Sequence, residues 1–419
     1  MERIHHLRSH LTAKALCTNP SQCLLPDSIK SDHDVVIVSA LRTPLTKAKR
    51  GAFKDTTPDI MLEQVLRAVL HQVQIDPASI GDICVGNVLQ PGAGAAMARI
   101  AQLSADIPYT VPLHAVNRQC ASGLQAIASV ASSIQAGFYD IGIACGVESM
   151  TFDGMSQNLP CIDQHKARNK DAMDCMIPMG ITSEEVASKY GISREKQDAF
   201  AASSHEKASR AQRNGTFTAE IAPVNVTVKK GENMETSLIT QDDGIRSDTT
   251  VERLGKLKPV FKTNGSTTAG NSSQLTDGAA AAILMGRKAA NRFGLPILGR
   301  FVSYSVVGVP PSIMGIGPSV AIPKALLDAD ITIQDIDIFE INEAFASQAV
   351  YCIEKLGIPA DKVNPNGGAI ALGHPLGCTG VRQVATLLHE LKRTKGRYGV
   401  VSMCVGTGMG AAAVFESEE

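Results

Sequence analysis

The sequence lacks several features that mark whole classes of protein. Its 419 residues include no tryptophan, and aromatic residues make up 4% of the chain. The 40 basic and 41 acidic residues nearly cancel, which argues against binding nucleic acid through a basic surface. No apolar run reaches the length of a membrane-spanning helix. The ten cysteines include no Cys-x-x-Cys pair, so there is no zinc-ribbon or thioredoxin signal, and the pattern fits a reducing compartment.

The residues that are present indicate a large α/β protein. The chain is 44% hydrophobic and has 36 glycines, enough for a substantial core with many close turns, in two or three domains or one compound domain. Buried strands are predicted at residues 34–39, 83–87, 141–146 and 278–285, where β-branched or small apolar residues run together. Helices are predicted from Pro58, at 95–103, at 124–134 and at 287–293.

Residues 151–270 are more charged than their surroundings and contain only short apolar runs. A capping box at residues 182–185 is expected to open a helix, and residues 193–213 form a polar helix ended by Asn214 and Gly215. Alternating valines from Val224 predict a hairpin. We interpret this segment as an insertion that covers a site and lies outside the central sheet.

Four stretches recur in the same order in the second half of the chain. Residues 75–87 resemble 331–342, and the segment after Cys120 resembles the one from Gly377. Residues 141–146 resemble 398–406, and the small apolar run near 278 resembles the run near 410. Such a repeat predicts a duplicated α/β core in which helix starts from both halves converge on one cleft.

Cys120 stands where an extended segment, 110–116, turns into a helix. Backbone N–H groups at a helix start lack intrahelical partners and favour negative charge, so this position predicts a lowered thiol pKa and a nucleophile. An inert core cysteine is the competing interpretation.

Three further residues are candidates for the same chemistry. His374, in a glycine-rich loop, could accept a proton from a thiol, although a buried structural histidine fits the pattern too. Cys404 and Asn342 each end a predicted strand, where open α/β sheets place their ligands. The glycines from Gly406 to Gly410 do not predict a dinucleotide site, because only nine residues follow. A metal site is not predicted either, because closely spaced ligand pairs are absent.

The first eleven residues form a basic, aliphatic leader. Arg3, Ile4, His10 and Leu11 match the pattern of the N-terminal peroxisomal targeting signal, while a mitochondrial transit peptide is the alternative. The following residues read as a connector, and the leader could be removed after Cys17 or Cys23.

These motifs resemble the thiolase family, and within it the peroxisomal 3-ketoacyl-CoA thiolases. The matching stretches are "NRQCASGLQA" around Cys120, "NGGAIALGHPLGCTG" around His374, "SMCVGTGMGAA" around Cys404, "NEAFA" from Asn342 and "TAGNSSQLTDGAAA" from residue 268. The resemblance covers residues 34–417 and favours cleavage of the leader after Cys23.

The resemblance implies a thiolase fold, a duplicated five-layered αβαβα core with an inserted loop domain. It divides the chain into a leader and linker (1–33), an N-terminal half (34–150 plus 271–292), the loop domain (151–270) and a C-terminal half (293–419). It also implies a homodimer or a tetramer, peroxisomal location and an import receptor for the leader, with the mitochondrial matrix as the alternative location.

The resemblance further implies roles for individual residues. Cys120 would attack the 3-keto carbonyl of a 3-oxoacyl-CoA, His374 would take its proton, and Cys404 would protonate the released enolate. Two oxyanion sites are expected, one at His374 with a water held by Asn342, the other at the backbone N–H groups of Cys120 and Gly406.

Substrate contacts are expected from the loop domain and its neighbours. Ser273 would contact pantetheine, and Met179 and Met314 would line the acyl or pantetheine channel or simply fill the core. No metal or cofactor is expected, coenzyme A being a co-substrate. The resemblance implies thiolytic cleavage of 3-oxoacyl-CoA by coenzyme A to acetyl-CoA and an acyl-CoA two carbons shorter, through an acyl-cysteine, as the last step of fatty-acid β-oxidation. Two other functions stay open: condensation of two acetyl-CoA by an acetoacetyl-CoA thiolase with the same residues, and a non-catalytic acyl-CoA-binding protein.

Overall fold

A computed structural model describes residues 30–152, 169–230 and 233–418. The leader residues Arg3, Ile4, His10 and Leu11, and both cleavage positions, lie outside this range. Within the described range, no helix is long and apolar enough to cross a bilayer.

The strands are β1 Val35–Arg42, β2 Thr46–Lys47, β3 Asp82–Gly86, β4 Leu113–Val116, β5 Ile141–Ser149, β6 Val224–Lys230, β7 Asn233–Ile239, β8 Thr276–Gly286, β9 Gly299–Gly308, β10 Ile338–Ile341, β11 Tyr398–Val405 and β12 Met409–Ser417. The α-helices are α2 Pro58–Val73, α3 Ala95–Ser104, α4 Ser122–Gln135, α5 Lys170–Asp174, α6 Met179–Tyr190, α7 Arg194–Arg213, α8 Val251–Gly255, α9 Arg287–Phe293, α10 Gly317–Asp328, α11 Ala346–Leu356, α12 Ala369–Leu372 and α13 Leu376–Thr394.

The two halves of the core have the same strand topology. In the first, β3 runs parallel to β5, and β5, β8 and β1 follow in antiparallel pairs. In the second, β10 runs parallel to β11, and β11, β12 and β9 follow in the same way. A short pairing of Val36 with Arg300 and Ile37 with Gly299 joins the two sheets. The internal repeat predicted from the sequence is therefore confirmed.

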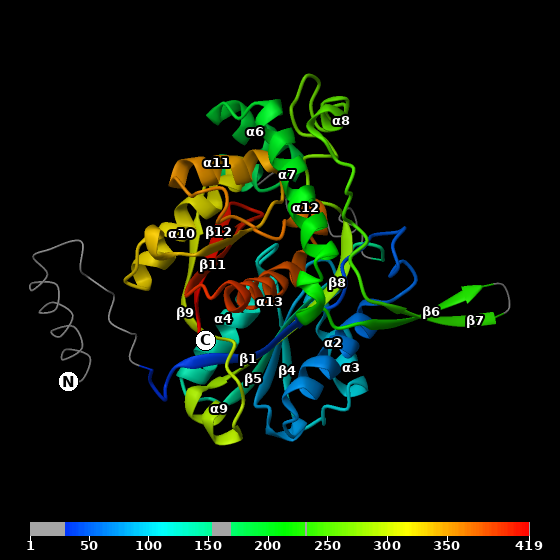
Figure 1. Cartoon of the computed structure of the whole chain (residues 1–419), viewed down its shortest axis with the longest axis vertical. Helices are drawn as coiled ribbons and strands as arrows, with labels where there is room; N and C mark the ends of the chain where they lie inside the picture. The colour runs from blue at the N-terminus through cyan, green and yellow to red at the C-terminus, as the bar shows by residue number, and fades with distance from the viewer. Residues whose placement is uncertain (1–29, 153–168, 231–232, 419) are drawn as a thin grey trace, which may run out of the picture.

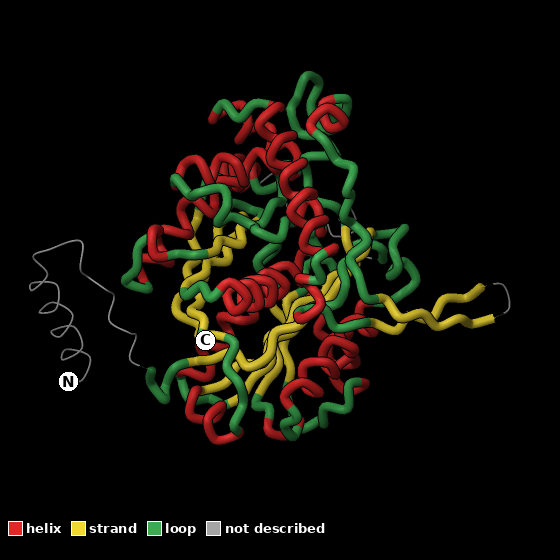
Figure 2. The backbone as a smooth tube through the Cα atoms, viewed as in Figure 1, coloured by secondary structure: helices red, strands yellow, loops and turns green. Residues whose placement is uncertain are grey.

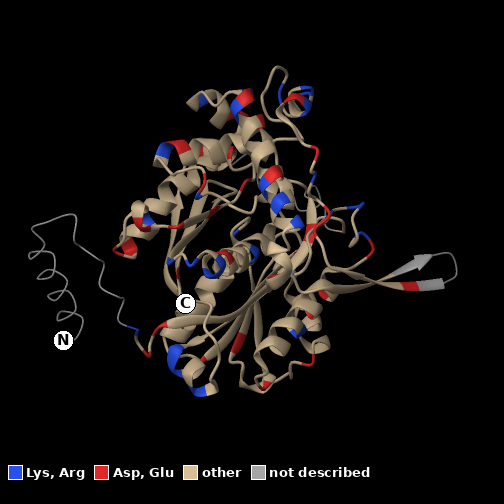
Figure 3. Ribbon diagram, viewed as in Figure 1, with Lys and Arg blue, Asp and Glu red and all other residues tan. Residues whose placement is uncertain are grey.

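Five layers result from this duplication (Figures 1 and 2). Helices α4 and α13 lie between the sheets and pack against each other, with α2 and α3 outside the first sheet and α10 outside the second. Three apolar clusters fill the spaces between these layers. Charged side chains lie mainly on the outer helices and loops, whereas the sheets carry few (Figure 3). The predicted αβαβα core is confirmed.

The middle layer is tight because glycines allow backbone contact between the halves. A Cβ atom at Gly146, in β5, would lie 2.1 Å from the carbonyl oxygen of Gly377. A Cβ at Gly380, in α13, would lie 2.2 Å from the backbone nitrogen of Leu124 in α4. These approaches bring the start of α13 against the start of α4 and so bring the two halves of the site together.

Most predicted elements appear where the sequence placed them. Helix α7 has Ser193 as its N-cap and ends at Asn214, and β6 and β7 pair only with each other, as a hairpin that projects from the body (Figure 1). The capping box at residues 182–185 is wrong, because α6 already begins at Met179 and Thr182 donates its hydroxyl to Met179 O. Pro178 precedes this helix, so the start is set by proline and not by a side-chain cap.

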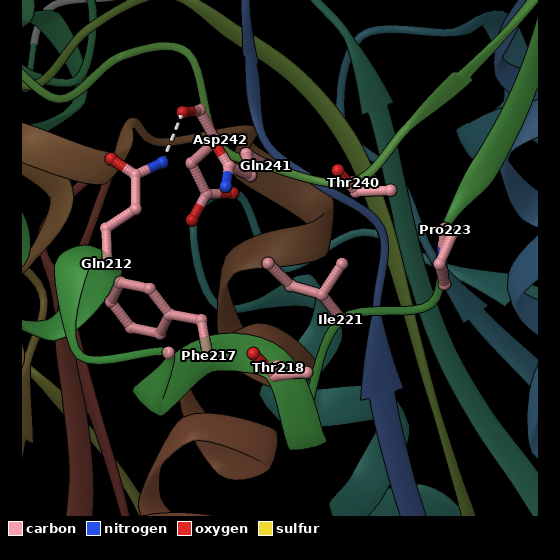
Figure 4. A pocket seen from close by; sticks show the side chains of 9 residues that line it. Gln212, Phe217, Thr218, Ile221, Pro223, Thr240, Gln241 and Asp242 are labelled. Carbon is pink, nitrogen blue, oxygen red and sulfur yellow. Dashed lines mark hydrogen bonds between the residues drawn. The ribbon is translucent and has the colours of Figure 1, made fainter.

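A buried cluster of ion pairs joins Glu220 and Asp242 to strand β1 of the core. Arg42, at the end of β1, donates two hydrogen bonds to Asp242 (2.7 and 2.9 Å) and one to Glu220 (2.5 Å). Beside it lies a cavity of about 280 Å³, shown in Figure 4, where Gln212 donates to Asp242 O. The cavity is lined by residues of the segment from Gln212 to Asp242, and none of the candidate catalytic residues belongs to it.

Candidate active site

The Cys120 loop is a tight elbow between β4 and α4. Gln119 adopts a left-handed backbone with a φ of 46°, which costs a non-glycine residue free energy. The Ser122 hydroxyl stabilises the turn, since it accepts from Arg118 N (2.9 Å) and donates to Gln119 O (2.7 Å). Cys120 is half-buried and packs beside the apolar side chains of Leu89, Met150 and Leu376. The elbow predicted from the sequence is confirmed.

The predicted direction of the Cys120 pKa is wrong. Burial raises the pKa of this thiol to about 11, because desolvation disfavours the thiolate. The backbone N–H groups of Gly406 and of Cys120 itself interact with the sulfur and lower the pKa, but by less than burial raises it, and the Glu148 charge raises it further. Helix α4 begins only at Ser122, so the thiol lies outside the first turn, where the helix N–H groups act most strongly.

His374 lies between α12 and α13, in a loop that needs glycine before it. Gly373 has a φ of 105°, and a Cβ there would lie 2.0 Å from Thr276 Oγ1. His374 N donates to Gln274 O (3.1 Å), which fixes the backbone. The whole residue is only 4% exposed. The loop therefore holds the ring in one place inside the protein.

The hydrogen bonds of His374 define its tautomer. Asn342 Nδ2, an obligate donor, lies 3.3 Å from Nε2, so Nε2 is the acceptor. Nδ1 then carries the proton and donates to Thr379 Oγ1 (2.6 Å), whose own hydroxyl donates to Pro375 O. Burial and then the Arg382 charge lower the pKa of His374 to about 3. The ring is thus neutral, and Nε2, which accepts from Asn342, is its unprotonated nitrogen, as a proton acceptor requires.

Cys404 and Asn342 come from neighbouring strands of the second half. Cys404 is fully buried on β11, and burial together with nearby Cys120 raises its pKa well above the usual value. Asn342 follows β10, donates its N–H to Ser402 O (2.8 Å) and is also fully buried. At rest, both thiols and the imidazole are therefore uncharged.

Gly406 opens the turn between β11 and β12. Next to it, Thr407 has a φ of 67°, an unfavourable backbone for a β-branched residue. The N–H of Gly406 faces the Cys120 sulfur. Two left-handed residues, Gln119 and Thr407, thus flank the place where this N–H and the thiol meet, so backbone strain is concentrated at the site.

The remaining predicted residues lie around the same centre. Met314 and Met179 pack in one apolar cluster with Cys404, and Met314 is 1% exposed, as a core residue would be. Ser273 donates its N–H to Ala344 O (3.0 Å), two residues after Asn342. The structure thus gathers Cys120, His374, Cys404, Asn342 and Gly406, with Ser273 and both methionines beside them.

Three residues at the site were missed by sequence reasoning. Thr379 holds the imidazole, and its only signal was its place one turn into the helix after His374. Gln348 lies in α11, and its side-chain carboxamide is 3.0 Å from Cys404 Sγ. Glu148 is fully buried and accepts the N–H groups of Val88, Leu89 and Gly377, so it ties the two halves together.

This arrangement suits acyl transfer between thiols. A cysteine faces two backbone N–H groups that can stabilise an oxyanion, a neutral histidine can accept its proton, and a second thiol lies close by. In the described residues, no group of three or more His, Cys, Asp or Glu side chains could hold a metal ion.

Comparisons with known proteins agree with this chemistry. The family model "Thiolase, N-terminal domain" matches residues 35–288, and "Thiolase, C-terminal domain" matches residues 295–417. The chain is 62% identical to 3-ketoacyl-CoA thiolase B, peroxisomal, of Rattus norvegicus over 424 residues, 99% of each chain. It is 60% identical to the peroxisomal 3-ketoacyl-CoA thiolase of Homo sapiens, again over 99% of each. The crystal structure of the dimeric peroxisomal thiolase of Saccharomyces cerevisiae matches with a TM-score of 0.87 and 50% identity, covering 93% of this chain and 98% of that one.

Proposed function

Since the chain belongs to the thiolase family, we propose that Cys120, His374 and Cys404 carry out its reaction. The protein is an acyltransferase, a 3-ketoacyl-CoA thiolase of fatty-acid β-oxidation, and it is peroxisomal. It cleaves 3-oxoacyl-CoA with coenzyme A to acetyl-CoA and an acyl-CoA two carbons shorter. The observation that carries the residue roles is geometric: Gly406 N–H and Cys404 both lie beside Cys120, and Asn342, next to the strand of Cys404, contacts His374.

The first half-reaction forms an acyl-enzyme. Cys120 Sγ attacks the 3-keto carbon as its proton passes to His374 Nε2, and the C2–C3 bond then breaks. The electron pair of that bond becomes the enolate of acetyl-CoA, and the Cys404 thiol protonates it at C2. The proton on His374 returns to the Cys404 thiolate, which restores both groups. Since no free thiolate exists at rest, deprotonation of Cys120 accompanies attack.

The second half-reaction returns the acyl group to a thiol. Coenzyme A gives its proton to His374 and attacks the thioester on Cys120. Collapse of the tetrahedral intermediate releases the Cys120 thiolate, which takes the proton back. In both half-reactions an oxyanion forms next to Cys120 Sγ, where the N–H groups of Gly406 and Cys120 lie. The enolate oxygen of the first half-reaction would be stabilised by His374 and a water held by Asn342.

Substrate recognition and assembly form part of the same proposal. Coenzyme A is the co-substrate, with Ser273 beside its pantetheine and Met179 and Met314 along the channel. The chain forms a homodimer, as the yeast thiolase does, and a tetramer would be a dimer of such dimers. The domain boundaries at residues 33, 150, 270 and 292 belong to this proposal, and so does an import receptor that reads Arg3, Ile4, His10 and Leu11.

Turnover of a defined substrate tests the function. Purified protein with 3-oxooctanoyl-CoA and coenzyme A is expected to form equal amounts of acetyl-CoA and hexanoyl-CoA, followed by mass spectrometry. Repeating the assay with acetoacetyl-CoA separates this activity from that of an acetoacetyl-CoA thiolase, which would prefer the four-carbon substrate. A folded protein that turns over neither would be a binding protein.

Thr379→Val is expected to lower kcat roughly ten- to a hundredfold, part of what a positioned general base contributes. Valine keeps the shape of threonine but cannot accept the Nδ1–H bond, so the imidazole loses its fixed tautomer. Steady-state thiolysis measures the effect. Thr386→Val is the matched control, since its hydroxyl lies on the same helix and contacts Glu220. Equal losses in both variants would contradict the role of Thr379.

A further inference from the structure

Gln348 makes a contact that the proposed mechanism does not use. It lies in the first turn of α11, is 1% exposed, and its carboxamide reaches to 3.0 Å from Cys404 Sγ. Helix α11 follows the strand end that carries Asn342. One buried amide therefore links the residue next to the base with the second thiol.

The neighbours of the amide define which end faces the sulfur. One orientation satisfies both: Nε2 donates to Asn342 O (3.2 Å), and Oε1 accepts from Ala349 N (2.7 Å). In this orientation the atom 3.0 Å from Cys404 Sγ is the amide nitrogen. Its two hydrogens then have two acceptors, Asn342 O and the sulfur.

Packing holds Gln348 in this place. Gly315 lies so close that a Cβ on it would approach to 2.7 Å from Gln348 Cβ. The carbonyl oxygen of Gly315 also accepts a hydrogen bond from Cys352 Sγ (3.4 Å). The side chain is therefore confined on one side by the glycine and on the other by Asn342 and Cys404.

We propose that Gln348 is a positioning residue that holds Cys404 Sγ through an amide N–H and stabilises the thiolate formed when Cys404 gives its proton to substrate. In that step the S–H bond breaks, a C2–H bond forms on the acetyl-CoA enolate, and the electron pair stays on sulfur. A hydrogen bond to the resulting anion is stronger than one to the thiol, so Gln348 assists the transfer. This inference rests on the proposed function, because it requires Cys404 as the acid.

The other surroundings of Cys404 mostly disfavour its thiolate form. Burial raises the pKa of Cys404 most, and nearby Cys120 and Cys352 raise it further, whereas its own backbone N–H lowers it. A neutral donor such as the Gln348 amide stabilises the Cys404 thiolate less than a positive charge would. Cys404 can therefore return to the thiol form after each turnover.

Two half-reactions separate the role of Gln348 from a general effect on folding. Exchange of labelled coenzyme A into hexanoyl-CoA requires acylation of Cys120 but no C–C bond cleavage, so Cys404 is not needed. Thiolysis of 3-oxooctanoyl-CoA requires both. Gln348→Met, which keeps an unbranched side chain and removes the donor, is expected to slow thiolysis roughly 10- to 100-fold and to change exchange less than about threefold.

A pH profile and a control variant complete the experiment. Deuterium uptake at the acetyl-CoA methyl group in D₂O needs the Cys404 thiolate, so in Gln348→Met its rate should fall and its profile should move to higher pH. Gln348→Glu, which places an oxygen beside the sulfur, should lose at least as much thiolysis. Gln197→Met is the control, a buried glutamine bonded to Ile192 O and Ser266 Oγ, and should keep the ratio of the two rates.

Each other outcome has a distinct meaning. Equal loss of exchange and thiolysis in Gln348→Met, or no loss of either, would overturn the inference about Gln348. The proposed function would still stand in that case, provided that the wild-type protein carries out thiolysis. Wild-type protein that exchanges coenzyme A without cleaving 3-oxooctanoyl-CoA would instead contradict the proposed function.

Discussion

Cys120→Ser is expected to lower thiolysis by roughly four orders of magnitude or more, as loss of a catalytic nucleophile does. Serine fits the elbow, but its hydroxyl is a far weaker acid than a thiol, and an oxygen ester does not exchange readily with coenzyme A. Mass spectrometry of the intact protein provides the measurement. Wild type incubated with 3-oxooctanoyl-CoA alone should gain one hexanoyl group, and Cys120→Ser should gain none.

A second cysteine serves as the control for this result. Cys84→Ala removes a thiol that is buried in β3 within the core, so it should still form the adduct. Substantial turnover by Cys120→Ser would overturn the assignment of the nucleophile. An adduct on Cys404 in that variant would show that the two thiols can exchange roles.

Alkylation of Cys120 reports the protonation state of the resting enzyme. The thiolate is the reactive form, and with a pKa of about 11 its fraction grows about tenfold with each pH unit below that value. Inactivation by iodoacetamide should therefore accelerate throughout the range from about pH 6 to pH 9. A plateau near neutral pH would instead support the lowered pKa that the helix-start position predicted.

Gly146→Val is expected to destabilise the fold by more than about 4 kcal/mol, a loss seen when a core cannot relax. The new Cβ would meet Gly377 O at 2.1 Å and Cys378 Cα at 2.8 Å. These are backbone atoms in the first turn of α13, which is buried between two sheets and cannot retreat. Denaturant unfolding measures the change, or the yield of soluble protein if the variant does not fold.

Gly308→Val is the matched control for Gly146→Val. Gly308 also lies in a strand, β9, but nothing lies within 4 Å of a Cβ placed there. Because valine suits a strand, its stability should change by less than about 0.5 kcal/mol. A stable Gly146→Val protein would mean that α13 can shift, and a loss of activity without loss of stability would locate that shift at His374.

Local patterns in the sequence predicted the secondary-structure elements whose formation depends on residues adjacent in the chain. Continuous β-branched or small apolar runs identified β1, β5 and β8, and Asn214 with Gly215 identified the end of α7. The repeat predicted two halves because each half must bury the same faces. The predicted capping box at 182–185 was wrong because the same polar tetrapeptide also suits the first turns of a helix that begins earlier, directly after Pro178.

Properties that depend on distant contacts could not be read in this way. The Cys120 pKa is set by burial between the two halves, which outweighs the nearby helix start. Thr379 and Gln348 take their roles from side chains that meet them only after folding. Glu148 shares no motif with Gly377, 229 residues away, yet it holds the His374 loop beside Cys120.

The two halves carry asparagines at equivalent positions, but with different partners. Asn87 follows β3 as Asn342 follows β10, and both are fully buried. Asn342 faces the imidazole, whereas Asn87 donates to Val147 O and to Glu148. Asn342 therefore contacts a proposed catalytic group, whereas Asn87 contacts the carboxylate that joins the two halves. Because we propose Cys120 as the residue that is acylated, intact protein should accept one acyl group per polypeptide.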